Sequence, residues 1–210
     1  YQSKLDKTEE YFHKSLEVKK EINDLGGMAN TYNNMAIISN KRGDYFKALN
    51  FARKALEMRR KLSPELTDSS DIIENKKKIG KAYMNIGNVH YQLGEYDKAI
   101  QNYETSMNLY DSVNYASGIA GCYNNIGEIF EQQGNYDQAI TYNKKALDYY
   151  LDNKNLHNAA TCYSNIGAAY IEKHDFGKAR KSLQQALEIS HKINDKQRES
   201  AVYTYLGVLN

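Results

Sequence analysis

The residues of this sequence best suited to chemistry are asparagines that recur in one context, each followed by an apolar residue and then Gly or Ala. A carboxamide carries two N–H donors and an acceptor oxygen, so it can pair with one peptide unit of an extended chain. A row of such amides would hold a peptide backbone; alternatively, each amide bonds the adjacent helix and only fixes helix stacking. The row consists of Asn34, Asn85, Asn125 and Asn165.

The other reactive side chains follow no catalytic or metal-binding pattern. Cys122 and Cys162 lie 40 residues apart at one motif position, and we expect both to be buried in the seam between helices. A redox pair is not expected, because a disulfide needs Cα atoms within about 7 Å, closer than successive stacked helices bring equivalent positions. The histidines lack a His or Cys partner at ligand spacing. No phosphate-binding Gly loop, nucleophile elbow or carboxylate pair appears. We therefore expect no enzyme activity, metal or cofactor. The histidines are His13, His90, His157, His174 and His191.

The asparagine row belongs to an internal repeat. Asn-Ile-Gly begins at Asn85, Asn125 and Asn165, 40 residues apart, and a weaker copy begins at Asn34, 51 residues before the first of these. The segment that starts at Tyr205 continues the 40-residue spacing. Seven residues after each motif a turn Gly follows, replaced by His in the last copy, and an Ala comes five residues later. These residues are Gly43, Gly94, Gly134 and His174, then Ala48, Ala99, Ala139 and Ala179.

Each repeat predicts a hairpin of two helices. Apolar residues at i, i+3 and i+7 form the stripe of a first helix, and the motif Gly lets a second helix approach closely. Gly134 can end the first helix in a left-handed cap, and Asn135, or Asp44 in an earlier copy, can cap the second. The apolar face is too wide to bury alone, so neighbouring copies must stack. In the fourth copy the stripe is Tyr123, Ile126 and Phe130.

These motifs resemble the tetratricopeptide repeat family, which has an aromatic residue at position four, Leu-Gly at seven and eight, Gly at fifteen and Ala at twenty. The aromatic position is held by Tyr83, Tyr123 and Tyr163. Repeats of 40 residues instead of 34 indicate longer helices, and the usual closing Pro is absent. Long repeats of this kind are similar to arrays in Bacteroidetes-type bacterial signalling and regulatory proteins and in G-protein-regulating spindle adaptors. The resemblance covers nearly the whole chain and implies an all-α, right-handed superhelical solenoid of antiparallel hairpins.

We expect a single array of about ten helices, with four full repeats and half a repeat at each end. Eleven extra residues separate the second and third copies, and we expect a loop there with the next helix beginning near Asp71. Because arrays need capping repeats, we also expect the native chain to continue in both directions. The expected segments are a second helix at 1–24, a repeat at 25–62, an insert loop at 63–70, repeats at 71–114, 115–154 and 155–194, and a first helix at 195–210.

The resemblance also implies a ligand site, because first helices line the concave groove of this family at motif positions two, five, six, nine, twelve and thirteen. The second copy places Asn30, Ile37, Asn40 and Lys41 there. The expected peptide-binding residues are Asn33, Asn34, Lys81, Met84, Asn85, Asn88, Tyr91, Asn124, Asn125, Glu128, Glu131, Ser164, Asn165 and Glu172.

Charge along these positions is polarised, with Lys41 and Lys81 in earlier copies and Glu128, Glu131 and Glu172 in later ones. Such a gradient could orient a ligand with complementary ends; scattered surface charge is the alternative. The carboxylate clamp of chaperone-binding relatives requires Lys or Arg at defined positions, and no register of this sequence supplies them. A chaperone-tail clamp is therefore not expected.

Composition narrows the partners further. Lys plus Arg number 28 against 26 Asp plus Glu, and no dense basic stripe is present, so this segment is not expected to contact nucleic acid. No apolar run approaches the roughly 20 residues that span a bilayer, so we expect a soluble segment without membrane contact. The cytoplasm is the favoured location, with the periplasm as the alternative if the segment belongs to a membrane-anchored sensor.

These observations predict a protein- or peptide-binding scaffold that uses its concave groove. The preferred setting, which rests on resemblance alone, is the sensing or regulatory segment of a larger bacterial signalling protein, where an effector domain of the same chain could be the partner. A rigid assembly adaptor and a structural spacer without a switching role are the alternatives.

Overall fold

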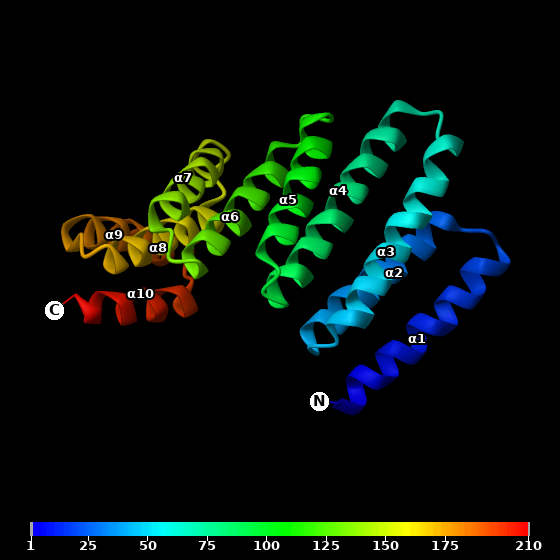
Figure 1. Cartoon of the computed structure of the whole chain (residues 1–210), viewed down its shortest axis with the longest axis horizontal. Helices are drawn as coiled ribbons and strands as arrows, with labels where there is room; N and C mark the ends of the chain where they lie inside the picture. Colours follow the sequence, from blue (N-terminus) through cyan, green and yellow to red (C-terminus); the bar gives the residue numbers. More distant parts are fainter. Residues whose placement is uncertain (1, 210) are drawn as a thin grey trace. The chain divides into compact units, whose positions relative to one another are not determined.

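The computed structural model describes residues 2–209, with side chains from residue 7 onward, as ten α-helices joined by short turns (Figure 1). No β-strand occurs in this described range, and within each part of the chain consecutive helices pack against one another as hairpins. The predicted all-α fold of stacked hairpins is confirmed. The chain divides into two compact units, Tyr1–Tyr115 and Ala116–Asn210, and each is described by itself.

The first unit packs α2 against α3 and α4 against α5 as hairpins, with α1 on α2 and α3 on α4 between them. In the second unit α6–α7 and α8–α9 are the hairpins, and α10 packs on α9. The first unit consists of α1 (Gln2–Glu21), α2 (Leu25–Lys41), α3 (Tyr45–Leu62), the 3-10 turn η1 (Ser63–Glu65), α4 (Ser69–Gln92) and α5 (Tyr96–Asp111). The second consists of α6 (Ala116–Gln132), α7 (Tyr136–Asp152), α8 (Leu156–Glu172), α9 (Phe176–Ile193) and α10 (Lys196–Val208).

Close packing inside each hairpin follows from small residues at fixed positions. The Ala of each second helix is fully buried, at 0% exposure in all four copies. A Cβ atom added at Gly87 would lie 2.6 Å from the Tyr103 ring, and one added at Gly167 would lie 2.7 Å from Leu183 Cγ. The motif Gly therefore permits the close helix approach that was predicted from its position.

The turns within hairpins use a left-handed residue after each first helix. Gly134 has φ of 72°, as predicted for a helix-ending Gly, and His174 takes the same conformation with φ of 56°. Asn135 caps α7, since its side chain accepts a hydrogen bond from the backbone N–H of Gln138. The expectation for Asp44 is wrong, because its side chain makes no capping hydrogen bond to α3.

The insertion between the second and third copies lengthens a helix. Only Ser63–Glu65 form a separate 3-10 turn, and α4 starts at Ser69, two residues before the expected position. Helix α4 has 24 residues, whereas α2, α6 and α8 have 17 each. The difference corresponds to about two helical turns, and these extra turns carry Asn75, which is buried against the end of α3.

Candidate functional site

The first helices of the first unit form a groove, here called the α2–α4 groove. Its main hollow has a volume of about 260 Å³ and is open to solvent. Six of its eight lining residues occupy motif positions expected to face a ligand. They are Ile37, Asn40, Lys41, Lys81, Asn85 and Asn88, joined by Ala36 and Val89.

The α2–α4 groove offers polar groups that the protein itself leaves available. The Oδ1 atom of Asn40 is buried and accepts no hydrogen bond from any described residue. Lys41 and Lys81 are exposed, and among the described side chains no carboxylate lies within ion-pair distance of either. No Asp or Glu lines this hollow. The groove is therefore positively charged and holds an unused hydrogen-bond acceptor.

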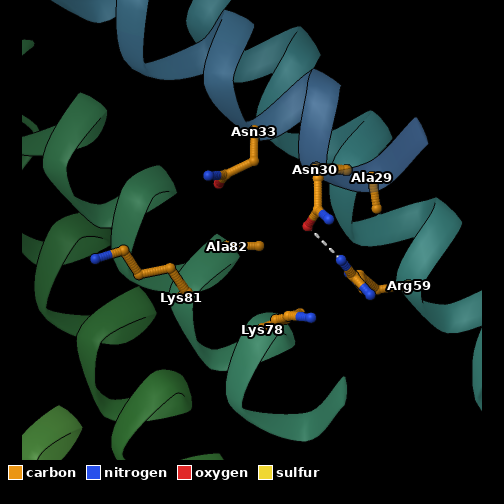
Figure 2. A pocket seen from close by; sticks show the side chains of 8 residues that line it. Ala29, Asn30, Asn33, Arg59, Lys78, Lys81 and Ala82 are labelled. Atoms are coloured by element: carbon orange, nitrogen blue, oxygen red, sulfur yellow. Dashed lines mark hydrogen bonds between the residues drawn. The ribbon is translucent and has the colours of Figure 1, made fainter. Parts of the chain in front are cut away.

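A second, smaller hollow of about 50 Å³ shares Lys81 with the main one (Figure 2). Asn30 points from α2 toward Arg59 of α3, and its Oδ1 accepts a hydrogen bond from that guanidinium at 2.5 Å. Lys78 and Lys81 line the hollow from α4. Three cations and two carboxamides thus line this small hollow, although the ammonium end of Lys81 points away from Arg59 (Figure 2). The full lining is Ala29, Asn30, Asn33, Ala55, Arg59, Lys78, Lys81 and Ala82.

The asparagine row is used differently from copy to copy. Asn85 is buried and donates from Nδ2 to Asn33 Oδ1 at 2.6 Å, which ties α4 to α2. Asn165 is half-buried and donates to Oδ1 of Asn143 on α7 at 3.2 Å. Asn125 is half-buried and Asn34 is exposed. At two of the four positions the amide therefore supports packing between helices, while its oxygen is left for further bonds.

The other expected groove residues of the first unit lie beside the hollows. Asn88 accepts a hydrogen bond from the Tyr103 hydroxyl at 2.8 Å, and the ring of Tyr91 packs against that of Tyr96. Met84 is half-buried. These contacts fix the groove wall.

In the second unit, α8 and α10 enclose a hollow of about 400 Å³, here called the α8–α10 groove. Its lining includes the expected residues Ser164 and Asn165. Its charged residues, Asp195 and Arg198, were not among the residues expected in the groove. Arg198 lies 3.4 Å from Asp195 Oδ2, and Asp195 also lies 3.2 Å from His157 Nδ1. Hydrogen bonds to the Arg198 backbone N–H, then the nearby Arg198 charge, hold the pKa of Asp195 below its usual value.

The expected acidic residues of the second unit do gather. Burial raises the pKa of Glu131, and the charges of Glu128 and Glu172 raise it further. Tyr136 donates a hydrogen bond to Glu172 at 3.4 Å. Asn124, from the same first helix as Glu128, accepts a weak bond from the Cys162 thiol at 3.7 Å.

Both cysteines and one of the five histidines are buried among the helices. Cys122 and Cys162 are both 0% exposed, as predicted, and burial raises the pKa of Cys162 to about 12. His90 is buried, with Nδ1 2.5 Å from Glu95 Oε2. Among the described residues, no group of three or more His, Cys, Asp or Glu side chains could hold a metal ion. In the same part of the chain, no helix combines the length and apolarity needed to cross a membrane.

Sequence reasoning missed Arg59, Asn75 and Lys78. Arg59 lies in the basic run Arg59-Arg60-Lys61, which has the appearance of a solvated helix face. Its position in the repeat carries the signal, because the equivalent residues in the next two copies are tyrosines, both buried. A charged residue at a buried aromatic position, next to an insertion, indicates a local specialisation. The equivalents of Arg59 in later copies are Tyr110, Tyr150 and Ser190.

Stacked helical hairpins with a groove lined by their first helices define a helical repeat protein of the binding-scaffold class. A family model described as tetratricopeptide repeat matches residues 1–61, 78–152 and 118–192. The chain belongs to the tetratricopeptide repeat family. No curated protein sequence matches it.

Solved structures share the fold at low sequence identity. Aspartyl phosphate phosphatase F from Bacillus subtilis matches with a TM-score of 0.86 at 16% identity, over 99% of this chain and 53% of that one. A STAND signal transduction ATPase with a tetratricopeptide repeat sensor, from Pyrococcus horikoshii, matches at 0.79 and 23%, over 98% and 30%. A Rap protein complexed with competence and sporulation factor matches at 0.72 and 15%, over 93% and 54%. This chain thus spans only about a third to a half of these three proteins.

Proposed function

We propose that this chain is a protein- or peptide-binding scaffold whose α2–α4 groove takes an extended peptide segment. The observation that carries the proposal is the lining of that groove: carboxamides, two unpaired lysines, and a buried Asn40 oxygen without a donor. A turn of the Asn40 amide would present that oxygen to a ligand backbone N–H. Lysines beside it favour a ligand of negative charge.

We further propose that the scaffold is the sensing or regulatory segment of a larger bacterial signalling protein. Two of the similar structures support this setting, one named as the repeat sensor of a signalling ATPase and one as a complex with competence and sporulation factor. A rigid adaptor or a spacer would share the fold. A regulatory segment should change its hydrodynamic radius or its domain contacts when a peptide binds, whereas an adaptor should not.

The groove can be tested with an array of random 12-residue peptides, followed by NMR mapping of any binder on the ¹⁵N-labelled chain. We expect shifts in α2 and α4 around Asn40 and Lys81. Lys81→Ala should weaken binding about tenfold, as expected for a charge that contacts the ligand. Lys144→Ala, which removes an equally exposed lysine from α7, should leave binding unchanged. Shifts confined to other helices, or the absence of any binder, would contradict the proposal.

A further inference from the structure

Arg59 is a buried cation bonded only to neutral oxygens. It is 6% exposed, and among the described residues no carboxylate lies within ion-pair distance. Its guanidinium donates to the Gly26 carbonyl at 3.2 Å and to Oδ1 of Asn30 and of Asn75, at 2.5 and 3.4 Å. Burial lowers the pKa of Arg59, yet an arginine stays charged at neutral pH.

The nearest carboxylates already have other roles. Asp24 accepts the Gly27 backbone N–H at 2.7 Å as the N-cap of α2. Glu74 pairs with Lys78 at 3.4 Å on the exposed side of α4. The charges of both carboxylates favour the charged form of Arg59, but neither lies within ion-pair distance of its guanidinium. A direct ion pair to this buried cation is therefore left for an anion from outside the chain.

The small hollow beside Arg59 suits such an anion. Its walls are alanines, Ala29, Ala55 and Ala82, with Lys78 and Lys81 as the other cations and no Asp or Glu in the lining. Figure 2 shows the ammonium end of Lys78 on the same side of the hollow as the guanidinium. A volume of about 50 Å³ exceeds one water-sized sphere several times over, which is room for a carboxylate and little more.

We infer that this hollow is a carboxylate subsite of the α2–α4 groove, in which Arg59 holds an acidic group of the bound peptide and Lys78, already paired with Glu74, adds positive charge beside it. The inference rests on the proposed function, because the hollow shares Lys81 with the larger hollow where the peptide would lie. The three hydrogen bonds of Arg59 use both N–H groups of Nη2 and one of Nη1. Its Nε–H and one Nη1–H remain, so a ligand carboxylate oxygen can accept a charge-assisted hydrogen bond from the guanidinium.

The insertion explains why this subsite occurs in one copy only. Asn75 belongs to the extra turns of α4; it bonds the Arg59 guanidinium through Oδ1, and through Nδ2 it donates to the Arg59 carbonyl at 3.1 Å and to Ser63 Oγ at 2.9 Å. It therefore holds the end of α3 against α4 with the guanidinium turned to the hollow. Helices α6 and α8 lack these turns.

Three sets of random 12-residue peptides test the subsite by fluorescence polarisation. The first has a central Glu and an amidated C-terminus, the second a central Gln and an amidated C-terminus, and the third a central Gln and a free C-terminal carboxylate. We expect binders from the first set to lose about tenfold in affinity when Glu is replaced by Gln, equivalent to 1.4 kcal/mol. Binders mainly from the third set would assign the same subsite to a chain terminus.

Protein variants separate the subsite from the rest of the groove. Arg59→Gln should remove the Glu preference, so that the peptide and protein changes are not additive. Arg53→Gln, which removes an exposed charge from the same helix, should keep the preference. On the unaltered protein, the Arg59 Nε–Hε resonance should move with the Glu peptide and not with its Gln partner, a result independent of how the variants fold.

The outcomes distinguish the two proposals. If peptides shift α2 and α4 but Glu and Gln forms bind equally, or if Arg59→Gln keeps the preference, the subsite is overturned and the groove stands. If no peptide of any set binds, both fail.

Discussion

The α2–α4 and α8–α10 grooves are built from equivalent first helices, yet their charges are organised differently. In the α2–α4 groove, lysines and Arg59 face hollows that no carboxylate lines. In the α8–α10 groove, Arg198 is matched by Asp195, which also pairs with His157. The repeat fixes where groove side chains stand, while residues outside the motif decide whether a groove is left charged or neutralised.

The recurring asparagine also occupies a fixed position in the repeat but has different partners in the two units. Asn85 bonds a neighbouring first helix through Asn33, whereas Asn165 bonds a second helix through Asn143. Helix stacking uses one amide N–H in each place. A ligand of these two side chains would therefore bond the second N–H or the carboxamide oxygen.

The largest expected effect compares a Gly packed inside a hairpin with an exposed Gly. Gly87→Ala should destabilise the protein by about 2–3 kcal/mol, because the new methyl group would stand 2.6 Å from the Tyr103 ring in a packed core. Gly177→Ala is the control change at an exposed position of α9, where the one atom within 4 Å is Asp175 Oδ1 at 3.9 Å, and it should be neutral or slightly stabilising because Ala favours helix. Urea unfolding followed by circular dichroism compares them; equal losses would contradict the packing argument.

The next effect tests the insertion. Asn75→Ala should cost about 2 kcal/mol, because Arg59 and Ser63 lose a buried partner. The loosened guanidinium should also weaken binding of Glu-containing peptides. Asn153→Ala removes an exposed Asn whose Nδ2 bonds the Tyr149 carbonyl at 2.9 Å, and it should cost under about 0.5 kcal/mol. Denaturant midpoints that fall equally in the two variants would show that the extended α4 needs no such anchor.

The hairpins were predictable because each is specified by local repeats. Gly134, Ala139 and the Tyr123 stripe recur at fixed spacing, and their steric consequences do not depend on distant residues. Even the decayed turn at His174 keeps the left-handed backbone of its Gly equivalents. Family membership followed from the same residues.

The subsite was not predictable by the same reasoning. The 51-residue spacing appears as a loop in the sequence, but its residues extend α4 and bring Asn75 to Arg59. That contact joins residues of two helices across an irregular segment, so no repeat template contains it. The cap predicted at Asp44 also depends on information that the repeat does not carry. The residue type permits the capping bond, but side-chain geometry decides whether it forms.

A smaller effect sharpens the role of the unused acceptor in the α2–α4 groove. Asn40→Ala should raise the free energy of unfolding by about 1 kcal/mol, because a buried oxygen without a donor is removed. The same variant should bind groove peptides more weakly. Stability and affinity changing in opposite directions, measured by urea unfolding and fluorescence polarisation, would identify Asn40 as a ligand contact; a loss of stability would show that its oxygen is satisfied in solution.

The smallest effect tests the acidic group of the second unit. Burial and two neighbouring carboxylates raise the pKa of Glu131, so the folded state binds its proton more tightly than the unfolded chain does. Folding stability therefore falls as the pH rises through the unfolded value of about 4.3, and it stays lower above the raised folded pKa. Glu131→Gln should stabilise the protein at pH 7, by less than about 1 kcal/mol because the group is partly exposed, and should give no gain at pH 3.

The control is Asp148→Asn, the same loss of charge at an exposed site on α7, which should show no such pH-dependent gain. Thermal melts at pH 7 and pH 3 measure the change in stability of each variant. An equal gain in stability for both variants would mean that the net charge of the unit matters and the local cluster does not.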